Sequence, residues 1–250
     1  MCALAQIIAF VSGKGGTGKS SICAAMATTL AQTGSRVLCI DCVEGMPGLD
    51  IPLGMAAEGC ISWREVCRGD YSARQGTCHP WFPAVRLLTA AVRGAETPLQ
   101  SDLFGRMLQS AETDFDYILL DAPADMGPMF HLAVQQADCC IVVALPDPAA
   151  IRAARRVGEE LERLGKGNVR LVVNRVNERM LKAMGLTIDD VVDQTGLQLL
   201  GLVPVDTDVL EAAAAGSALL RYSKKGAAAA INRICQRMQG NPVKIPVRSF

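Results

Sequence analysis

The chain has 250 residues, of which half are hydrophobic and only 4% are aromatic. Its 25 basic and 25 acidic residues cancel, so the net charge favours neither nucleic acid nor an anionic surface as a partner. This length suits one α/β domain spanning residues 1–250, with a core of small aliphatic side chains.

Ten cysteines would suggest disulfides in a secreted protein. We expect reduced thiols and a cytoplasmic location instead, because a strand and a glycine-rich loop follow within a dozen residues of Met1, where a signal peptide would lie. No apolar run reaches the roughly 18 residues that cross a membrane. Cys39 and Cys42 have C-x-x-C spacing, but the two-residue period of a strand places them on opposite faces. We therefore expect no metal cluster.

The first predicted strand is 7–11, IIAFV, and the first predicted helix is 19–32. Between them, residues 13–20 have the sequence GKGGTGKS, which fits the phosphate-binding pattern G-x-x-x-x-G-K-[ST]. A strand, a glycine loop and a helix in this order present backbone N–H groups to an anion, so a chance glycine-rich turn is the weaker interpretation. The expected phosphate-binding residues are Gly13, Lys14, Gly15, Gly16, Thr17, Gly18, Lys19, Ser20 and Ser21.

The second predicted strand, 37–40, ends beside Asp41. Residues 68–83 follow no regular pattern and are predicted to form a surface excursion anchored by Trp81 and Phe82. Continuous apolar strands separated by helices predict a mostly parallel, twisted sheet of about seven strands with helices on both faces. The remaining strands are predicted at 85–90, 117–121, 140–145, 169–174 and 199–204, and the helices between them include 102–112 and 151–165.

Polar side chains stand where several of these strands end, which is where ligands bind in an open parallel sheet. Asp121 closes YILLD, as a carboxylate that holds Mg²⁺ would; an ordinary capping aspartate is the alternative. Asn174 ends LVVN, and its amide offers the donor and the acceptor that an adenine edge requires; a loop asparagine is the alternative. Arg175 follows it, and Pro204 and Asp206 are placed to lie against the same base.

Four arginines cluster on the predicted helix 151–165, which raises the question of nucleic-acid binding. Glutamates interleave with them, so we expect a solvated face of ion pairs and no nucleic-acid partner. The arginines are Arg152, Arg155, Arg156 and Arg163, and the glutamates are Glu159, Glu160 and Glu162.

The C-terminal segment 226–239 has apolar side chains at helical spacing. This pattern predicts a final helix packed on the sheet, with Arg233 and Arg237 outside. Pro242 and Pro246 oppose a continuing helix, so we expect membrane contact to be weak or absent.

These motifs, in this order, resemble the deviant Walker-A P-loop ATPases of the MinD/ParA family, and MinD-type proteins most. Residues 14–20 match the family pattern K-G-G-x-G-K-[ST] with its additional first lysine. The segments 37–55 and 115–124 resemble the two switch segments of the family, and LVVNR and GLVPVDTDVLEA resemble its adenine-contacting segments. The resemblance covers about residues 6–240.

The resemblance implies that ATP closes two subunits face to face and that hydrolysis releases them. Lys14 would reach phosphate in the other subunit, because a lysine so early in the loop cannot easily fold back. Catalytic roles would fall to Lys14, Lys19 and Asp41, and Mg²⁺ would be held by Ser20, Asp41 and Asp121. The implied cofactors are ATP or ADP with Mg²⁺, and the implied partners are a second copy and a protein of unknown identity.

Two positions depart from the family pattern. Val43 stands where the first switch normally has a second aspartate, and valine cannot place the attacking water. Glu44 is next in the chain but should face the other way. We expect slow or absent hydrolysis with binding retained. Asp125 replaces a glycine of the second switch, which we expect to weaken ATP relative to ADP.

Three functions are consistent with these features. The first is an ATP-dependent dimerising switch that positions cell-division or other cellular machinery, in the cytoplasm with at most peripheral membrane contact. The second is a regulatory or scaffold protein that binds nucleotide without useful hydrolysis, which Val43 favours. The third is a metabolic enzyme on the same fold.

Overall fold

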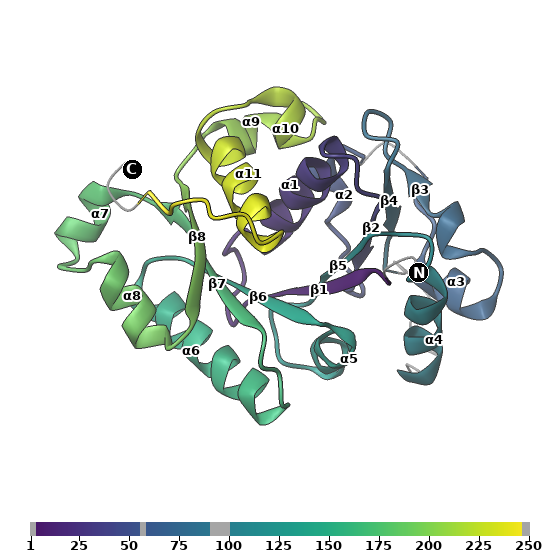
Figure 1. Cartoon of the computed structure of the whole chain (residues 1–250), viewed down its shortest axis with the longest axis horizontal. Coiled ribbons are helices and arrows are strands. Elements are labelled where there is room, and N and C mark those ends of the chain that lie inside the picture. Colours follow the sequence, from purple (N-terminus) through teal and green to yellow (C-terminus); the bar gives the residue numbers. More distant parts are fainter. Residues whose placement is uncertain (1–3, 56–58, 91–100, 247–250) are drawn as a thin grey trace.

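The computed structural model describes residues 4–55, 59–90 and 101–246. One eight-stranded sheet runs through this part of the chain in the order β3-β4-β2-β5-β1-β6-β7-β8 (Figure 1). Neighbouring strands are parallel except for β3 and β4. All seven predicted strands are confirmed, and β3 is an eighth. The strands are β1 (Gln6–Val11), β2 (Val37–Asp41), β3 (Thr77–Cys78), β4 (Val85–Leu88), β5 (Tyr117–Asp121), β6 (Cys139–Ala144), β7 (Val169–Val176) and β8 (Gln198–Pro204).

Helices cover both faces of the sheet, as predicted. Helices α1 and α11 lie against one face, and α5 and α6 lie against the other (Figure 1). The helices are α1 (Lys19–Gln32), α2 (Asp50–Leu53), α3 (Trp63–Arg68), α4 (Ser101–Ala111), α5 (Pro128–Gln136), α6 (Pro148–Arg163), α7 (Glu178–Ala183), α8 (Ile188–Thr195), α9 (Asp208–Ala214), α10 (Leu219–Tyr222) and α11 (Gly226–Met238), with a 3-10 turn, η1, at Ala73–Gln75.

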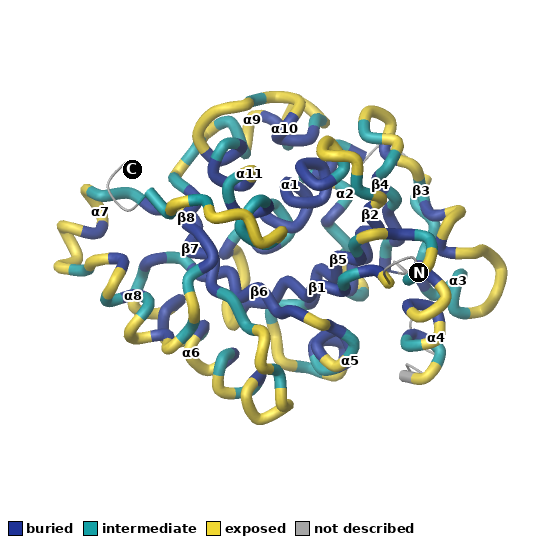
Figure 2. The backbone as a smooth tube through the Cα atoms, viewed as in Figure 1, coloured by how far each residue is buried: buried dark blue, intermediate teal, exposed yellow. Residues whose placement is uncertain are grey.

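The sheet separates two hydrophobic cores. Successive residues of a strand point to opposite faces, so Ile7 and Ala9 enter one core while Ile8 and Phe10 enter the other. Both cores need apolar side chains, which explains why the strands are continuous apolar runs. Figure 2 shows the same arrangement, with buried residues along the strands and exposed residues on the loops and outer helix faces.

The cysteines behave as small hydrophobic residues. Cys39 belongs to one core and Cys42 to the other, so the prediction that they lie on opposite faces is confirmed. Both are buried and neither forms a disulfide. Burial raises the pKa of the Cys42 thiol well above its usual value, so it stays protonated and unreactive.

The segment 68–83 has more structure than expected. It contains η1 and the two-residue strand β3, which pairs antiparallel with β4 at the edge of the sheet. Two residues are too few to produce a recognisable strand pattern. Phe82 packs against the core as predicted. Trp81 instead is 58% exposed, and the Arg221 guanidinium lies 3.5 Å from the centre of its ring.

His79 fastens this excursion to the body of the protein. Its buried ring accepts hydrogen bonds at Nδ1 from the backbone N–H groups of Trp81 and Phe82, at 3.1 and 3.3 Å. Nε2 therefore carries the ring hydrogen and donates it to the Leu53 carbonyl at 2.8 Å. Only the neutral ring can make all three bonds, and burial lowers the pKa of His79 below its usual value.

We expect the free energy of unfolding to fall as the pH falls below about 6.5, the ordinary pKa of histidine. The pKa of His79 is lower in the folded than in the unfolded chain. Its contribution to the free energy of unfolding is therefore fully present above the pKa of the unfolded chain and is lost as the pH falls through the pKa of the folded chain. Urea denaturation at several pH values measures this. The His79→Gln variant should lose stability at neutral pH and show a shallower pH dependence, whereas His131→Gln should retain the drop. Equal slopes for wild type and His79→Gln would contradict the prediction.

The C-terminal helix α11 packs on α1 and β8, as predicted. Arg237 is an exception to the prediction that its arginines lie outside. Its Nε donates to the Leu200 carbonyl at 2.7 Å, and its Nη1 donates to the carbonyls of Val243 and Lys244. This arginine holds the non-helical segment 241–246 against the protein, and residues 247–250 lie outside the described part.

Ion pairs along α6 confirm the predicted solvated face. Arg155 pairs with Glu159, and Arg163 pairs with Glu160, at 3.0 and 2.6 Å. Among the described helices, none combines the length and the apolar character that crossing a bilayer would demand.

Candidate functional site

The glycine loop joins β1 to α1 at the carboxyl edge of the sheet, as predicted. Gly18 precedes α1 with a φ of 87°, a left-handed conformation that glycine adopts without strain. A Cβ at Gly18 would lie 2.3 Å from the amide nitrogen of Asn174. A Cβ at Gly13 would lie 2.6 Å from the Ala153 carbonyl oxygen of α6. Both glycines are therefore required by close approach of other elements.

A buried ion pair lies beneath the loop. Lys19 Nζ is 2.5 Å from Asp121 Oδ1, and their side chains are only 8% and 1% exposed. The other carboxylate oxygen of Asp121 and the hydroxyl of Thr17 are buried without a hydrogen-bond partner among the described residues. Buried polar atoms are normally paired, so these two atoms indicate a group that binds from outside the chain.

Asp41 and Asp121 are the last residues of adjacent strands and stand side by side in register. The Asp41 carboxylate accepts backbone N–H bonds from Val43, Gly48 and Leu49 at 2.7–2.9 Å. Burial raises the pKa of Asp41, the bond from Leu49 opposes this, and the charge of Asp121 adds to it. In this conformation Asp41 therefore closes the loop that follows β2. Its predicted role toward Mg²⁺ stays a prediction.

The glycine loop lines a cavity of about 370 Å³, the phosphate-side cavity, and Val43 lines it as well. Glu44 faces away from it, as expected, and accepts from Arg64 Nε at 2.7 Å. Arg64 lies over the ring of Trp63, whose indole N–H donates to the Asp41 carbonyl at 3.1 Å. The sequence analysis did not single out Trp63 or Arg64, because neither belongs to a recognisable motif.

Lys14, the additional lysine of the loop, is 45% exposed and lies 3.6 Å from Asp147. Asp147 also caps α6 by accepting from the backbone N–H groups of Ala149 and Ala150. The ion pair thus connects the glycine loop to the start of α6. Asp147 precedes a proline in an ordinary helix-start pattern, and nothing in that pattern predicts a pair with Lys14.

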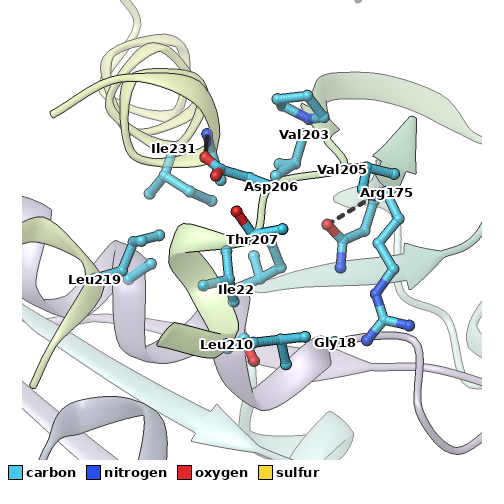
Figure 3. Close-up of a pocket in the computed structure, with 16 residues that line it drawn as sticks. Gly18, Ile22, Arg175, Val203, Val205, Asp206, Thr207, Leu210, Leu219 and Ile231 are labelled. Carbon is cyan, nitrogen blue, oxygen red and sulfur yellow. Dashed lines mark hydrogen bonds between the residues drawn. The ribbon is translucent and has the colours of Figure 1, made fainter. Parts of the chain in front are cut away.

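A second cavity of about 320 Å³ lies beside the loop, between α1, β8, α9 and α11 (Figure 3). The predicted base-contacting residues Asn174, Arg175, Pro204 and Asp206 all line it. Asn174 lies within β7, two residues before its end. Arg175 stands on one side of the cavity, and Leu219 and Ile231 on the other (Figure 3). Most of the lining is apolar, as suits a flat ring system.

The two cavities adjoin each other. The phosphate-side cavity is about 370 Å³, and Gly18, Ser21 and Arg175 line both. A ligand with a flat apolar end and a polyanionic end would fit this arrangement. Gly13 does not line either cavity and instead packs on α6. The remaining predicted phosphate contacts line the phosphate-side cavity, namely Lys14, Gly15, Gly16, Thr17, Gly18, Lys19, Ser20 and Ser21.

Residues 8–220 match the protein family described as the CobQ/CobB/MinD/ParA nucleotide binding domain. The chain belongs to this family. The septum site-determining protein MinD of Bacillus subtilis is 30% identical to it over 250 residues, which cover 98% of this chain and 92% of that protein. MinD from Thermotoga maritima is 27% identical over 246 residues, covering 97% of this chain and 91% of that protein.

Solved structures of MinD have the same fold. The MinC:MinD cell division protein complex of Aquifex aeolicus matches with a TM-score of 0.88 and 29% identity, covering 98% of this chain and 99% of that one. The Pyrococcus horikoshii septum site-determining protein MinD, complexed with Mg-ADP, matches with a TM-score of 0.82 and 24% identity, covering 94% and 96%. The predicted α/β P-loop fold and the predicted MinD-like membership of the CobQ/CobB/MinD/ParA family are thus confirmed.

Proposed function

We propose that this chain is a MinD-like switch protein that binds ATP with Mg²⁺ and dimerises around it to position cell-division or other cellular machinery. The observation that carries the proposal is the different placement of the two loop lysines. Lys19 is buried beneath the phosphate-side cavity of its own chain, whereas Lys14 is exposed beside it. An exposed cation at this position is suited to neutralising phosphate on a facing subunit.

The residues present fit a nucleotide with its metal ion. Lys19 would contact the terminal phosphates, and Ser20 with the unpaired oxygen of Asp121 would hold Mg²⁺, which commonly takes one or two protein carboxylates together with phosphate oxygens. Asp41 would join them once the loop after β2 releases it. Bound Mg²⁺ would neutralise charge that develops on the phosphates, while the chain supplies positioning. The family contains nucleotide-binding domains, and MinD of Pyrococcus horikoshii is complexed with Mg-ADP.

The dimer and the partner are separate elements of the proposal. The Aquifex aeolicus structure is a complex of MinD with MinC, which supports a protein partner for this chain as well. We propose that the chain works in the cytoplasm and that its partner recognises the ATP-bound dimer. Arg155 and Arg163 of α6 each pair with a glutamate of the same helix, so these two charges are balanced within the chain, and the proposal includes no nucleic-acid partner.

Light scattering with Mg-ATP, with Mg-ADP and without nucleotide tests the proposal. We expect the mass to double only with Mg-ATP. The Lys14→Ala variant should bind ATP normally and stay monomeric, while Lys182→Ala, which removes an exposed lysine of α7, should dimerise like the wild type. A monomer at all ATP concentrations, or a dimer that ignores nucleotide, would contradict the proposal.

A second candidate function is a nucleotide-binding scaffold that does not hydrolyse ATP. The observation that favours it is the position of Val43, an apolar side chain that lines the phosphate-side cavity, with Glu44 held away by Arg64. Under this alternative, dimerisation persists after ATP is added, because no turnover releases it. Under the proposed switch function, slow or partner-stimulated ATP hydrolysis returns the dimer to monomers.

A further inference from the structure

The loop after β2, residues 42–49, is anchored at its two ends by burial. Cys42 and Leu49 are fully buried, one in each hydrophobic core. The residues between them are less buried, and Met46 is highly exposed. Apolar packing therefore fixes the ends of this loop, and hydrogen bonds and ion pairs must fix its middle.

The Asp41 carboxylate holds the loop from the inside. Its Oδ2 accepts from the backbone N–H groups of Gly48 and Leu49 at 2.7 and 2.9 Å, and its Oδ1 accepts from that of Val43 at 2.9 Å. Oδ2 thus has both lone pairs engaged, whereas Oδ1 keeps one. Asp41 has no exposed surface and lines neither of the two cavities. A metal ion in the phosphate-side cavity would therefore reach this carboxylate only after the loop moves.

Arg64 of α3 holds the middle of the same loop from the outside. Its Nε donates to Glu44 Oε1 at 2.7 Å, and its Nη2 donates to the same oxygen. The side chains of Arg64 and Glu44 are only 13% and 28% exposed, so water competes little for these bonds. Hydrogen bonds between two charged groups are also stronger than those between neutral groups. This ion pair consequently resists movement of the loop.

Trp63 makes α3 a firm support for Arg64. The buried Trp63 ring packs edge to face on Phe104 of α4, beside which α3 lies (Figure 1). Its backbone N–H donates to the Thr89 carbonyl at 3.0 Å, and its indole N–H donates to the Asp41 carbonyl at 3.1 Å. The Arg64 guanidinium lies 4.9 Å from the centre of the Trp63 ring, a cation–π contact that orients it toward the loop.

We propose that Arg64 is a positioning residue that keeps the loop after β2 closed over Asp41 and so opposes the Mg-ATP-bound state. This inference rests on the proposed nucleotide-binding function. Only the released loop lets Asp41 join Ser20 and Asp121 at the metal ion. The pair of Arg64 with Glu44 stabilises the closed loop, so the affinity for Mg-ATP is reduced according to the fraction of the chain that is closed. ATP without a metal ion needs no contribution from Asp41, so the pair does not affect its binding.

Calorimetric titration with ATP, in the presence of Mg²⁺ and in EDTA, tests this role. Arg64→Met keeps an unbranched side chain over Trp63 and removes both bonds to Glu44. It should bind Mg-ATP about three- to tenfold more tightly than the wild type, and metal-free ATP equally well. Arg64→Lys retains a charged donor and should lie close to the wild type. Arg74→Met, which breaks a pair of 2.8 Å with Asp114 on η1, is the matched control and should change neither affinity.

Amide hydrogen exchange of the empty protein provides a second readout that requires no ligand. The N–H groups of Gly48 and Leu49 should exchange faster in Arg64→Met, because their bonds to Asp41 protect them while the loop is closed. The N–H groups of the central strand β1 should exchange as in the wild type, which distinguishes release of the loop from a general loss of stability.

The inference is overturned if Arg64→Met binds Mg-ATP no more tightly than the wild type, if metal-free ATP tightens equally, or if exchange at Gly48 and Leu49 is unchanged. With Asp41→Asn already in place, Arg64→Met should no longer tighten Mg-ATP, and a gain that persists there also overturns the inference. If this double variant does not fold, the single variant decides. A wild-type chain that binds ATP neither with Mg²⁺ nor without it would instead refute the proposed function itself.

Discussion

Replacing Lys19 by methionine should abolish nucleotide binding and also destabilise the empty protein by about 3–5 kcal/mol. The reason for the second effect is that the Asp121 carboxylate, 1% exposed, would lose the ammonium group 2.5 Å away and remain buried as an unpaired charge. Its second oxygen already lacks a protein partner among the described residues. Urea denaturation measures the stability, and titration with Mg-ATP measures the binding.

The double variant Lys19→Met with Asp121→Leu separates folding from function. Removing both charges should restore most of the stability, because a buried ion pair is often no more stabilising than apolar side chains of similar volume. Binding should stay absent. Arg155→Met, which breaks an exposed pair with Glu159 on α6, is the matched control and should cost at most about 1 kcal/mol. A Lys19→Met protein as stable as the wild type, or a double variant that loses the sum of both single effects, would contradict the argument.

Changing Val43 to aspartate should raise ATP hydrolysis by on the order of a hundredfold, because positioning of the attacking water and proton acceptance each contribute at least that much in comparable reactions. Val43 lines the phosphate-side cavity, so an aspartate there faces the ligand. Phosphate release measures the rate of hydrolysis. Saturating Mg-ATP is used so that an effect of the added charge on ATP affinity does not alter the measured rate.

Two control variants accompany this experiment. Val43→Asn should gain little, because an amide is not a base, and Glu44→Gln should leave the rate unchanged, because Glu44 is held by Arg64 away from the cavity. Wild-type turnover as fast as that of Val43→Asp would show that another group already positions the water. No increase in the variant would show that the missing carboxylate does not limit the rate.

Much of the fold could be predicted because its signals are local. Each apolar run of four to eight residues marks a buried strand, and the spacing of glycines and lysines in residues 13–20 marks a phosphate-binding loop whatever the rest of the chain does. The edge of the sheet at which the site lies also followed, because the carboxyl ends of parallel strands meet there. The strand β3 was not predicted, because two residues are too few to show the alternation of a strand.

The roles of individual polar side chains could not be predicted in the same way. Asn174 lies at the predicted site, but its amide bonds to Thr17, 157 residues away in the chain. Asp41 ends its strand as predicted, yet it bonds to the loop that follows. Arg237 has the helical position of an exposed residue, yet it turns back to the carbonyl of Leu200.

The glycine loop at residues 13–20, its flanking strand and helix, and the presence of Val43 in place of a carboxylate are all properties of the amino-acid sequence. They were enough to establish the fold class and the kind of ligand. Packing against distant elements decides which lysine is buried and which is exposed. It also decides which polar side chains are already hydrogen-bonded within the chain. The period of a strand or helix sets the face on which a side chain lies, but only packing of the elements decides what that side chain meets.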